Sequence, residues 1–370
     1  MSAPTDEEFR TEIRSWLAEH VHPDLVGLAW NRHLAAHGWT CVGWPVEHGG
    51  RGLSLTQQVI FHEEYALAQA PARVNHLGEE LLGPTLIAHG TPVQRARFLP
   101  RIKDVTELWC QGYSEPDAGS DLANVQTRAR LVGTEWVIDG QKVWTSNAHL
   151  SDWIFVVART EPGSQRHRGL SFLLVPLDQA GIEVRPIEQL TGGSEFNEVF
   201  FTGARTAGDL VVGEPGQGWA VAMALLGFER GVSTLAQQVG FERELSDLVA
   251  LARTNGTLAD PVLRDRLAQA RVGLAVMRAN VLRTLDAPAP GAESIAKLVW
   301  ANWHRDLGEL AMAIAGPAAL TAGDGPGCRL DAWQRLFLFS RADTIYGGSD
   351  EIQRNILAER VLGLPKEPRG

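Results

Sequence analysis

Residues 136–147 read Trp136-Val137-Ile138-Asp139-Gly140-Gln141-Lys142-Val143-Trp144-Thr145-Ser146-Asn147. The first five residues predict a strand that runs into a turn, because apolar and β-branched residues precede an Asp-Gly pair. The last residues place an indole before two hydroxyls, which suits a flat heterocyclic ligand: Trp144 can stack on it, and Thr145 and Ser146 can form hydrogen bonds. A hairpin that buries its tryptophan explains the segment equally well when it is read alone.

Further strand patterns follow this segment along the chain. Aromatic and β-branched runs bounded by turn residues occur at 153–158, 170–175 and 198–201. Each run has the length and composition of a strand. We therefore predict a compact β domain over residues 109–212.

Helical patterns dominate on both sides of the predicted β domain. A capping-box sequence begins at Thr5 and opens a helix. The apolar stripe of this helix is Phe9, Ile13, Trp16 and Leu17. Further helices are predicted at 55–70, 74–89, 92–103, 219–251, 261–285, 292–314, 328–341 and 350–361. The chain is thus predicted to have three domains, at 1–108, 109–212 and 213–370.

The composition is that of a globular protein without a nucleic-acid partner. The 370 residues are 44% apolar and 21% charged, and the net charge is −10, with no basic stripe in the sequence. No apolar run approaches the roughly 18 residues of a membrane span, and no signal peptide is visible, so we expect a cytoplasmic protein. The three cysteines, Cys41, Cys110 and Cys328, are far apart and predict neither disulfides nor a metal site.

A second polar segment lies at residues 112–121, before the first. It reads Gly112-Tyr113-Ser114-Glu115-Pro116-Asp117-Ala118-Gly119-Ser120-Asp121. Its glycines, serines and acids leave backbone N–H groups free to bind an electron-rich partner. An ordinary polar loop with turn chemistry is the alternative.

Taken in this order, with helical segments on either side, these two motifs resemble the acyl-CoA dehydrogenase family. The ending Gln353-Arg354-Asn355-Ile356-Leu357-Ala358-Glu359-Arg360-Val361-Leu362-Gly363 belongs to the same resemblance, which runs from about residue 5 to 364. It implies an α+β, mostly α fold, with an N-terminal helical domain, a middle β-barrel and a C-terminal four-helix bundle. It also implies FAD between the barrel and the bundle.

The resemblance assigns roles to residues of the two motifs. Ser114 and its neighbours, Tyr113 among them, would bind the pyrimidine edge of the flavin. Ser120, beside Gly119, would lie near the pyrophosphate and the acyl-CoA. Trp144 would lie against the isoalloxazine, with Thr145 as a hydrogen-bonding neighbour, and Ser146 would reach towards flavin N5. The cofactor-binding residues implied in this part of the chain are Tyr113, Ser114, Gly119, Ser120, Trp144, Thr145 and Ser146.

A third motif lies near the C-terminus, at residues 344–349. The resemblance implies that Tyr346, Gly347 and Gly348 line the thioester pocket and that Ser349 lies near FAD. We expect Asp350 and Glu351 to begin the next helix instead, because acids favour the positive end of a helix dipole.

The family needs one carboxylate that removes the proton α to the thioester. The third motif often supplies it, but glycine stands at that place here, at Gly347. Isovaleryl-CoA and long-chain acyl-CoA dehydrogenases are similar in carrying the base on an earlier helix, and the acid in that position here is Glu229. A surface glutamate paired with an arginine is the alternative reading of Glu229. Arg230 matches an arginine that the family places near the active site, and a surface arginine is its alternative.

Two departures from the family pattern concern the adenosine end of FAD. Homotetrameric members usually carry Arg-x-x-Phe-Gly and Gln-x-x-Gly-Gly-x-Gly, which reach the FAD of a neighbouring subunit. The first motif is absent here, and Ala313 replaces the glutamine of the second. One explanation is an α2β2 heterotetramer with a related subunit, as in bacterial sterol side-chain degradation. The other is a homo-oligomer that holds the adenosine through Arg264, Arg271 or Arg278.

The resemblance therefore implies an enzyme with FAD as its cofactor. The expected reaction is α,β-dehydrogenation of an acyl-CoA, or a carrier-protein thioester, to the trans-2-enoyl product, with electrons leaving to an electron-transfer flavoprotein. A flavin monooxygenase or N-hydroxylase on the same fold is an alternative, although it needs no thioester base. A non-catalytic partner subunit is another, and it predicts loss of the base and erosion of residues 144–146, neither of which is seen.

Overall fold

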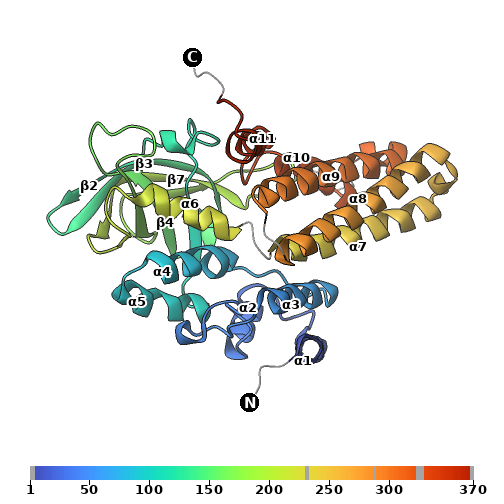
Figure 1. Cartoon of the computed structure of the whole chain (residues 1–370), viewed down its shortest axis with the longest axis horizontal. Helices are drawn as coiled ribbons and strands as arrows, with labels where there is room; N and C mark the ends of the chain where they lie inside the picture. The colour runs from blue at the N-terminus through green and yellow to red at the C-terminus, as the bar shows by residue number, and fades with distance from the viewer. Residues whose placement is uncertain (1–4, 230–232, 287–288, 322–328, 367–370) are drawn as a thin grey trace. The chain divides into compact units, whose positions relative to one another are not determined.

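The computed structural model describes residues 5–229, 233–286, 289–321 and 329–366 (Figure 1). The chain forms two compact units. The first contains residues 1–188 and 194–231, and the second contains residues 189–193 and 232–370.

The first unit begins with a helical part. Its helices are α1 (Asp6–His20), α2 (Gly27–Ala36), α3 (Leu55–Leu67), the π-helical η2 (Leu77–Leu82), α4 (Gly83–His89) and α5 (Pro92–Lys103). The capping box at Thr5 is confirmed, since the Thr5 hydroxyl accepts from the Glu8 N–H and the Glu8 carboxylate accepts from the Thr5 N–H. Phe9, Ile13 and Leu17 are buried as predicted, in one apolar cluster with residues of α2 and α3.

The β domain follows as an eight-stranded sheet in the order β6-β7-β3-β2-β4-β5-β8, with β1 paired to β4. Its strands are β1 (Trp109–Gly112), β2 (Arg128–Val132), β3 (Glu135–Ser146), β4 (Trp153–Arg159), β5 (Leu170–Pro176), β6 (Ile182–Pro186), β7 (Phe196–Ala207) and β8 (Val211–Val212). The strands predicted at 153–158, 170–175 and 198–201 are confirmed as β4, β5 and part of β7. The short strands β1, β2, β6 and β8 were not predicted. Strands β1 and β8 pair with strands distant in sequence, whereas β2 and β6 pair with the strand that follows each along the chain.

The turn predicted at Asp139-Gly140 is wrong. Strand β3 continues through both residues and pairs with β7 to Ser146, with register shifts at Ile138/Asp139 and at Lys142/Thr145. The Asp139 carboxylate accepts from the N–H of Gly203 on β7, at 2.7 Å. Gly140 has a φ of +153°, and a Cβ there would lie 2.7 Å from the Cα of Thr127. The glycine therefore serves a close backbone approach within the sheet rather than a chain reversal.

Helix α6 (Gly218–Glu229) closes the first unit and packs against β5, α4 and η2 (Figure 1). Gly218 is required at its start, because a Cβ there would lie 2.3 Å from the carbonyl carbon of Ser171. Residues 219–251 were predicted as one helix. The structure describes α6 and α7 on either side of residues 230–232, which lie outside the described residues.

The second unit is helical. It contains α7 (Ser233–Thr254), α8 (Pro261–Asp286), α9 (Ala292–Ala315), α10 (Ala332–Asp343), α11 (Asp350–Ile356) and the π-helical η7 (Leu357–Val361). Helix α10 begins later than the predicted residue 328, because Asp331 caps it by accepting from the Gln334 N–H. Helices α7 to α10 pack around one apolar core, so the expected order of helical domain, β domain and helical bundle is confirmed. Short 3₁₀ turns complete the chain: η1 (Val46–His48), η3 (Leu122–Asn124), η4 (Ala148–Leu150), η5 (Thr257–Ala259) and η6 (Gly316–Leu320).

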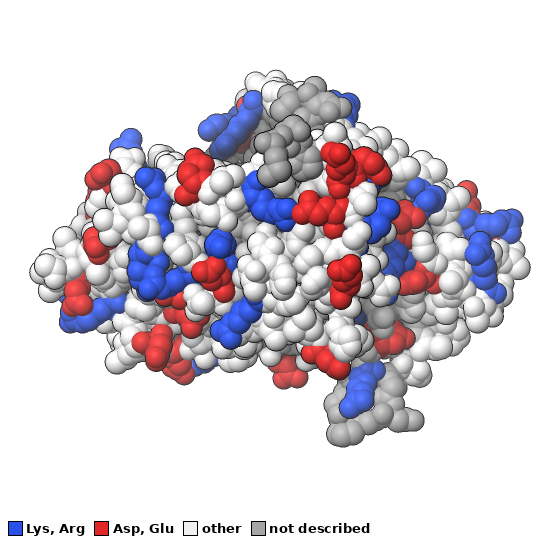
Figure 2. All heavy atoms as spheres, turned by 90° about the horizontal axis from the view of Figure 1, so that it is seen from below, with Lys and Arg blue, Asp and Glu red and all other residues white. Residues whose placement is uncertain are grey.

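The surface agrees with the charge pattern of the sequence. On the face drawn in Figure 2, basic and acidic side chains of the described residues are interspersed and form no continuous basic stripe. Among the described residues, no helix combines the length and the apolar character that crossing a membrane requires.

A buried histidine links three helices of the second unit. His304 on α9 contacts the Asp343 carboxylate of α10 through Nδ1 at 2.5 Å and the Glu244 carboxylate of α7 through Nε2 at 3.0 Å. Burial lowers the pKa of His304, but the two carboxylates outweigh it and raise the pKa to about 9. The imidazole is therefore charged at neutral pH. The carboxylate of Asp343 accepts a second hydrogen bond, from the hydroxyl of Tyr346 at 2.5 Å.

The charged His304 predicts a pH dependence of stability. Because its pKa is higher in the folded protein than in the unfolded chain, its contribution is fully present below about pH 6.5 and is lost as the pH rises through about 9. The pKa difference corresponds to a loss on the order of 3 kcal/mol. Urea denaturation measures the free energy of unfolding at about pH 6 and at about pH 10. We expect the fall between these two pH values to be about 3 kcal/mol larger for the native protein than for His304→Gln. Equal falls in the two proteins would show that His304 is not held charged.

Candidate functional site

The end of β3 presents one aromatic ring to solvent beside a buried hydroxyl. The register shift between Lys142 and Thr145 places Trp144 at a φ of +59°, and its side chain is 58% exposed. Such a bulge redirects a side chain out of the regular alternation of a strand. Phe196 of β7 supports the exposed indole edge-on, with ring centroids 6.1 Å apart. Thr145, the next residue, is completely buried, and its Oγ1 has no hydrogen-bond partner among the described residues.

Hydrogen bonds to backbone carbonyls hold this strand end in place. The Asn197 side chain donates to the Thr145 carbonyl at 2.9 Å, and the N–H of Asn147, at a φ of +55°, donates to the Glu195 carbonyl at 2.7 Å. The Val143 N–H donates to the Ser114 carbonyl at 2.9 Å. The two motifs of the sequence are therefore joined directly by a backbone hydrogen bond.

A buried ion pair fixes the loop of the first motif against β3. The Lys142 side chain is fully buried, and its Nζ donates to the Tyr113 carbonyl at 3.0 Å, the Val157 carbonyl at 2.8 Å and the Glu115 carboxylate at 2.8 Å. These three acceptors satisfy all three N–H groups of the ammonium. The Glu115 carboxylate also accepts from the backbone N–H groups of Gln126 and Thr127, at 2.5 and 2.9 Å.

Both members of this pair are charged at neutral pH. Burial lowers the pKa of Lys142 to about 8, although the Glu115 carboxylate raises it. Burial raises the pKa of Glu115, but Lys142 and the hydrogen bonds from Thr127 and Gln126 outweigh it, so this pKa lies below its usual value. This buried ion pair fixes the position of the loop relative to β3, because any movement of the loop would leave a buried charge without its partner.

The rest of the first motif is more open. Ser114 is half-buried, Gly119 and Ser120 are exposed, and a Cβ on Gly119 would meet no atom within 4 Å. Glu115 and Ala118 exchange backbone hydrogen bonds of 3.0 and 3.1 Å, which close the loop into a tight turn. This turn leaves the backbone around Gly119 and Ser120 accessible to a ligand.

The third motif forms a glycine loop in the second unit, before α11. Gly347 and Gly348 have φ values of +64° and +88°, and the Gln353 side chain donates to their carbonyls at 3.1 and 3.3 Å. A left-handed backbone strains any residue with a side chain, which favours glycine at 347 over an acid. Tyr346, half-exposed, is held by Asp343. Ser349 caps α11 by accepting from the Ile352 N–H at 3.5 Å, and Asp350 and Glu351 begin that helix as expected.

The predicted base lies at the edge of the described structure. Glu229 is the last residue of α6, but its side chain lies outside the described residues, as does the whole of Arg230. The roles predicted for both therefore stay predictions.

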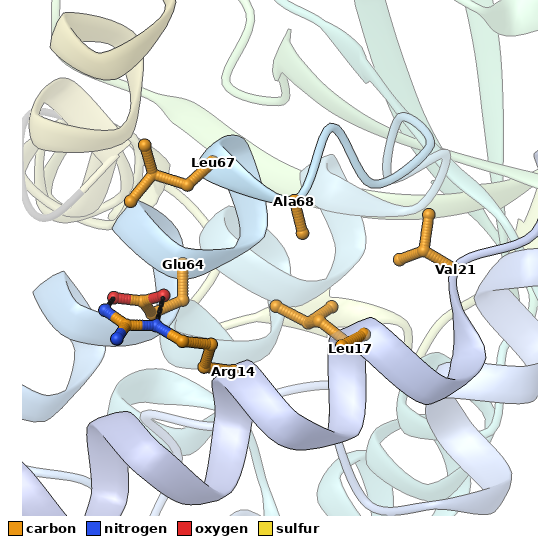
Figure 3. Close-up of a pocket in the computed structure, with 7 residues that line it drawn as sticks. Arg14, Leu17, Val21, Glu64, Leu67 and Ala68 are labelled. Atoms are coloured by element: carbon orange, nitrogen blue, oxygen red, sulfur yellow. Dashed lines mark hydrogen bonds and ion pairs between the residues drawn. The ribbon is translucent and has the colours of Figure 1, made fainter.

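A hollow elsewhere in the first unit is not part of this site. It has a volume of about 510 Å³ and lies between α1 and α3 (Figure 3). The ion pair of Arg14 with Glu64 forms one wall, at 2.9 Å. The other lining residues are Leu17, Ala18, Val21, Leu67 and Ala68. No predicted site residue whose side chain the structure describes lines this hollow.

The residues at the end of β3 fit a flat heterocyclic cofactor such as the flavin of FAD. An exposed indole next to a buried hydroxyl that has no partner in the described part of the chain offers one stacking surface and one unused hydrogen-bonding group. Sequence reasoning missed Lys142, the role of Glu115 and Asn197. The sequence gives a weak signal for the first two: Lys142 is followed by Val143 and Trp144, and an ammonium buried beside them needs a carboxylate nearby. No local signal marked Asn197.

Removal of the buried ammonium should loosen this part of the fold. In Lys142→Met, the Glu115 carboxylate would be buried without a counter-charge. We expect the free energy of unfolding of the first unit to fall by about 3–5 kcal/mol, as measured by urea denaturation followed by circular dichroism.

The control is an exposed ion pair of the same sheet. Arg205 on β7 contacts Glu135 on β3 at 2.9 Å, with both side chains about half-exposed. Arg205→Met should cost only about 0–1 kcal/mol. Equal costs for Lys142→Met and Arg205→Met would contradict a locking role for the buried pair.

Comparisons with known proteins agree with this geometry along the whole chain. Three family models match in succession: acyl-CoA dehydrogenase, N-terminal domain, over residues 3–105, middle domain over 110–204 and C-terminal domain over 216–362. The chain is 62% identical to acyl-CoA dehydrogenase IpdE1 of Mycobacterium tuberculosis, over 98% of this chain and 99% of that protein. It is 61% identical to the protein of the same name from Mycolicibacterium smegmatis, with the same coverage.

Solved structures show the same likeness. The structure described as the Tcur3481-Tcur3483 steroid ACAD matches with a TM-score of 0.86 at 29% identity, over 99% of both chains. The ChsE4-ChsE5 complex from Mycobacterium tuberculosis matches with a TM-score of 0.85 at 29% identity, again over 99% of both chains. With matches over every part of its fold, this chain belongs to the acyl-CoA dehydrogenase family and is an oxidoreductase.

Proposed function

We propose that the chain catalyses the FAD-dependent α,β-dehydrogenation of an acyl-CoA thioester to the trans-2-enoyl-CoA, with Glu229 as the base. The observation that carries this proposal is the 62% identity, over nearly the whole of both chains, to a protein named acyl-CoA dehydrogenase. The exposed Trp144 ring and the unpartnered Thr145 hydroxyl support a flavin at the end of β3.

The proposed chemistry divides between two parts of the chain. The Glu229 carboxylate takes the proton from the α carbon, and the electron pair of that C–H bond becomes the new double bond to the β carbon. The residues at the end of β3 would hold FAD, which would supply the acceptor for the hydride from the β carbon. Trp144, Thr145 and Ser146 orient the flat ring, and the backbone around Gly119 and Ser120 binds the pyrophosphate.

The glycine loop is the part that we assign to the thioester. Gly347 and Gly348 have left-handed backbones, and Gln353 fixes the loop through both of their carbonyls. A backbone N–H of this loop is suited to hold the thioester carbonyl and so acidify the α carbon. Because glycine occupies position 347, the base must come from elsewhere, and Glu229 supplies it in this proposal.

A steroid-derived acyl group is the substrate class that we favour. Two related solved structures are described as a steroid ACAD, with TM-scores of 0.85 and 0.86 at 30% and 29% identity. We further propose an electron-transfer flavoprotein as the electron acceptor, in keeping with the family.

We also propose that the chain acts as the catalytic subunit of a heteromer. It lacks both sequence motifs with which homotetrameric relatives reach the adenosine of a neighbouring FAD, and Ala313 stands in place of the glutamine of the second. The related structures Tcur3481-Tcur3483 and ChsE4-ChsE5 are each named for two components. A related subunit would supply the missing adenosine contacts.

Loss of the base should stop the reaction without removing the cofactor. Glu229→Gln keeps the size and polarity of the side chain but cannot take a proton. We expect acyl-CoA-driven dye reduction to slow by roughly 10²–10⁴-fold, while the flavin content per chain stays that of the native protein.

The matched control is Glu214→Gln, in the exposed loop before α6. It should dehydrogenate acyl-CoA at the native rate. A Glu229→Gln protein that retains native activity would show that another group is the base.

The heteromer makes a separate prediction about cofactor content. Expressed alone, the chain should purify with little FAD, and co-expression with a related acyl-CoA dehydrogenase subunit should restore about one FAD per pair of chains. A fully flavinated homo-oligomer from the chain alone would contradict this part of the proposal.

A further inference from the structure

Three histidines meet where the end of α1 lies beside α2, away from the motifs discussed above. They are His20, the last residue of α1, and His33 and His37 on and just after α2. One ring nitrogen of each lies within 4.8 Å of those of the other two. The ring centroids are 4.3 Å apart for His33 and His37, 5.1 Å for His20 and His37, and 5.2 Å for His20 and His33.

Hydrogen bonds to the backbone set the tautomers of two of these rings. His20 Nδ1 lies 2.8 Å from the Trp16 carbonyl, and His37 Nδ1 lies 2.8 Å from the His33 carbonyl. A carbonyl oxygen only accepts, so each Nδ1 carries the proton and each Nε2 is left with a free lone pair. Metal-binding histidines are held in this way, with the second nitrogen donating to a carbonyl or carboxylate.

The third ring has an unused nitrogen in a buried position. His33 Nε2 is buried and has no hydrogen-bond partner among the described residues. A buried polar atom without a partner is unfavourable and needs an explanation. Burial, with smaller contributions from His37 and His20, lowers the pKa of His33.

The surrounding aromatic residues make the cluster rigid. Trp16 stacks on His20, with centroids 4.3 Å apart and planes within 10°, and Trp30 stacks on His33 at 5.9 Å. His33 and His37 are four residues apart and so project from one face of the same helical turn. The ligand geometry therefore depends on packed helices rather than on a loop.

We propose that His20, His33 and His37 form a binding site for a divalent late transition metal, with Zn²⁺ as the ion of choice. Three neutral imidazoles suit Zn²⁺ better than they suit Mg²⁺ or Ca²⁺, which prefer oxygen ligands. His37 is exposed and borders a hollow of about 420 Å³ lined also by Glu12, Trp39 and Arg51. A fourth ligand, water or an exogenous group, can therefore enter from solvent.

The site does not depend on the flavin chemistry, so its test uses metal content alone. The untagged full-length protein is dialysed against buffered zinc chloride, and bound zinc is measured by mass spectrometry of the acid-digested sample. We expect one zinc ion per chain. His37→Gln, which changes an exposed side chain, should weaken zinc binding by at least about tenfold.

The control is His22→Gln, which removes an exposed histidine that is not part of the cluster. It should bind zinc as the native protein does. A second variant, His20→Gln, should match His37→Gln, and circular dichroism should show native helix content in all three variants. Absence of bound zinc in the native protein, or equal zinc binding in His37→Gln and His22→Gln, would overturn the proposal and leave the three rings as packing.

Discussion

The buried ammonium of Lys142 is the constraint on which the candidate site depends. Its three acceptors come from two segments: the carbonyl of Tyr113 and the carboxylate of Glu115 in the loop of the first motif, and the carbonyl of Val157 on β4. A fully buried charge cannot give up any of these without a large cost. The loop of the first motif and the strand β4 are therefore locked to β3 two residues before Trp144. The bulge that exposes Trp144 thus sits on a rigid support, as a surface for a flat cofactor should.

In the proposed function, different parts of the chain hold the flavin ring and move the proton. The end of β3 offers a stacking surface and a buried hydroxyl, and both are held by backbone hydrogen bonds that do not titrate. The glycine loop is held by Gln353 and, through Tyr346, by Asp343, which also keeps His304 charged. Its left-handed backbone favours glycine over an acid at position 347, and we assign the proton-accepting group to Glu229 instead.

Features that depend on residues close together in the sequence were predicted correctly. The capping box at Thr5, the buried stripe of α1 and the strands β4 and β5 were read correctly, because caps and apolar periodicity act within a few residues. The Asp139-Gly140 turn was wrong because pairing with β7 continues through it, and Gly140 serves the approach of Thr127. The ion pair of Lys142 and Glu115 connects residues that are 27 apart in sequence. The rings of His20 and His33 come together only because α1 packs against α2. Neither contact follows from spacing along the chain.

The most direct test of the account is the visible spectrum of the protein, prepared with its related subunit, during anaerobic addition of a saturated steroid-derived acyl-CoA. We expect an oxidised flavin band that this thioester bleaches, and one enoyl-CoA formed for each flavin reduced. The contrary result is a flavin that stays oxidised with every acyl-CoA but is reduced by a nicotinamide and then reacts with oxygen. That result would contradict acyl-CoA dehydrogenation and indicate a monooxygenase on the same fold.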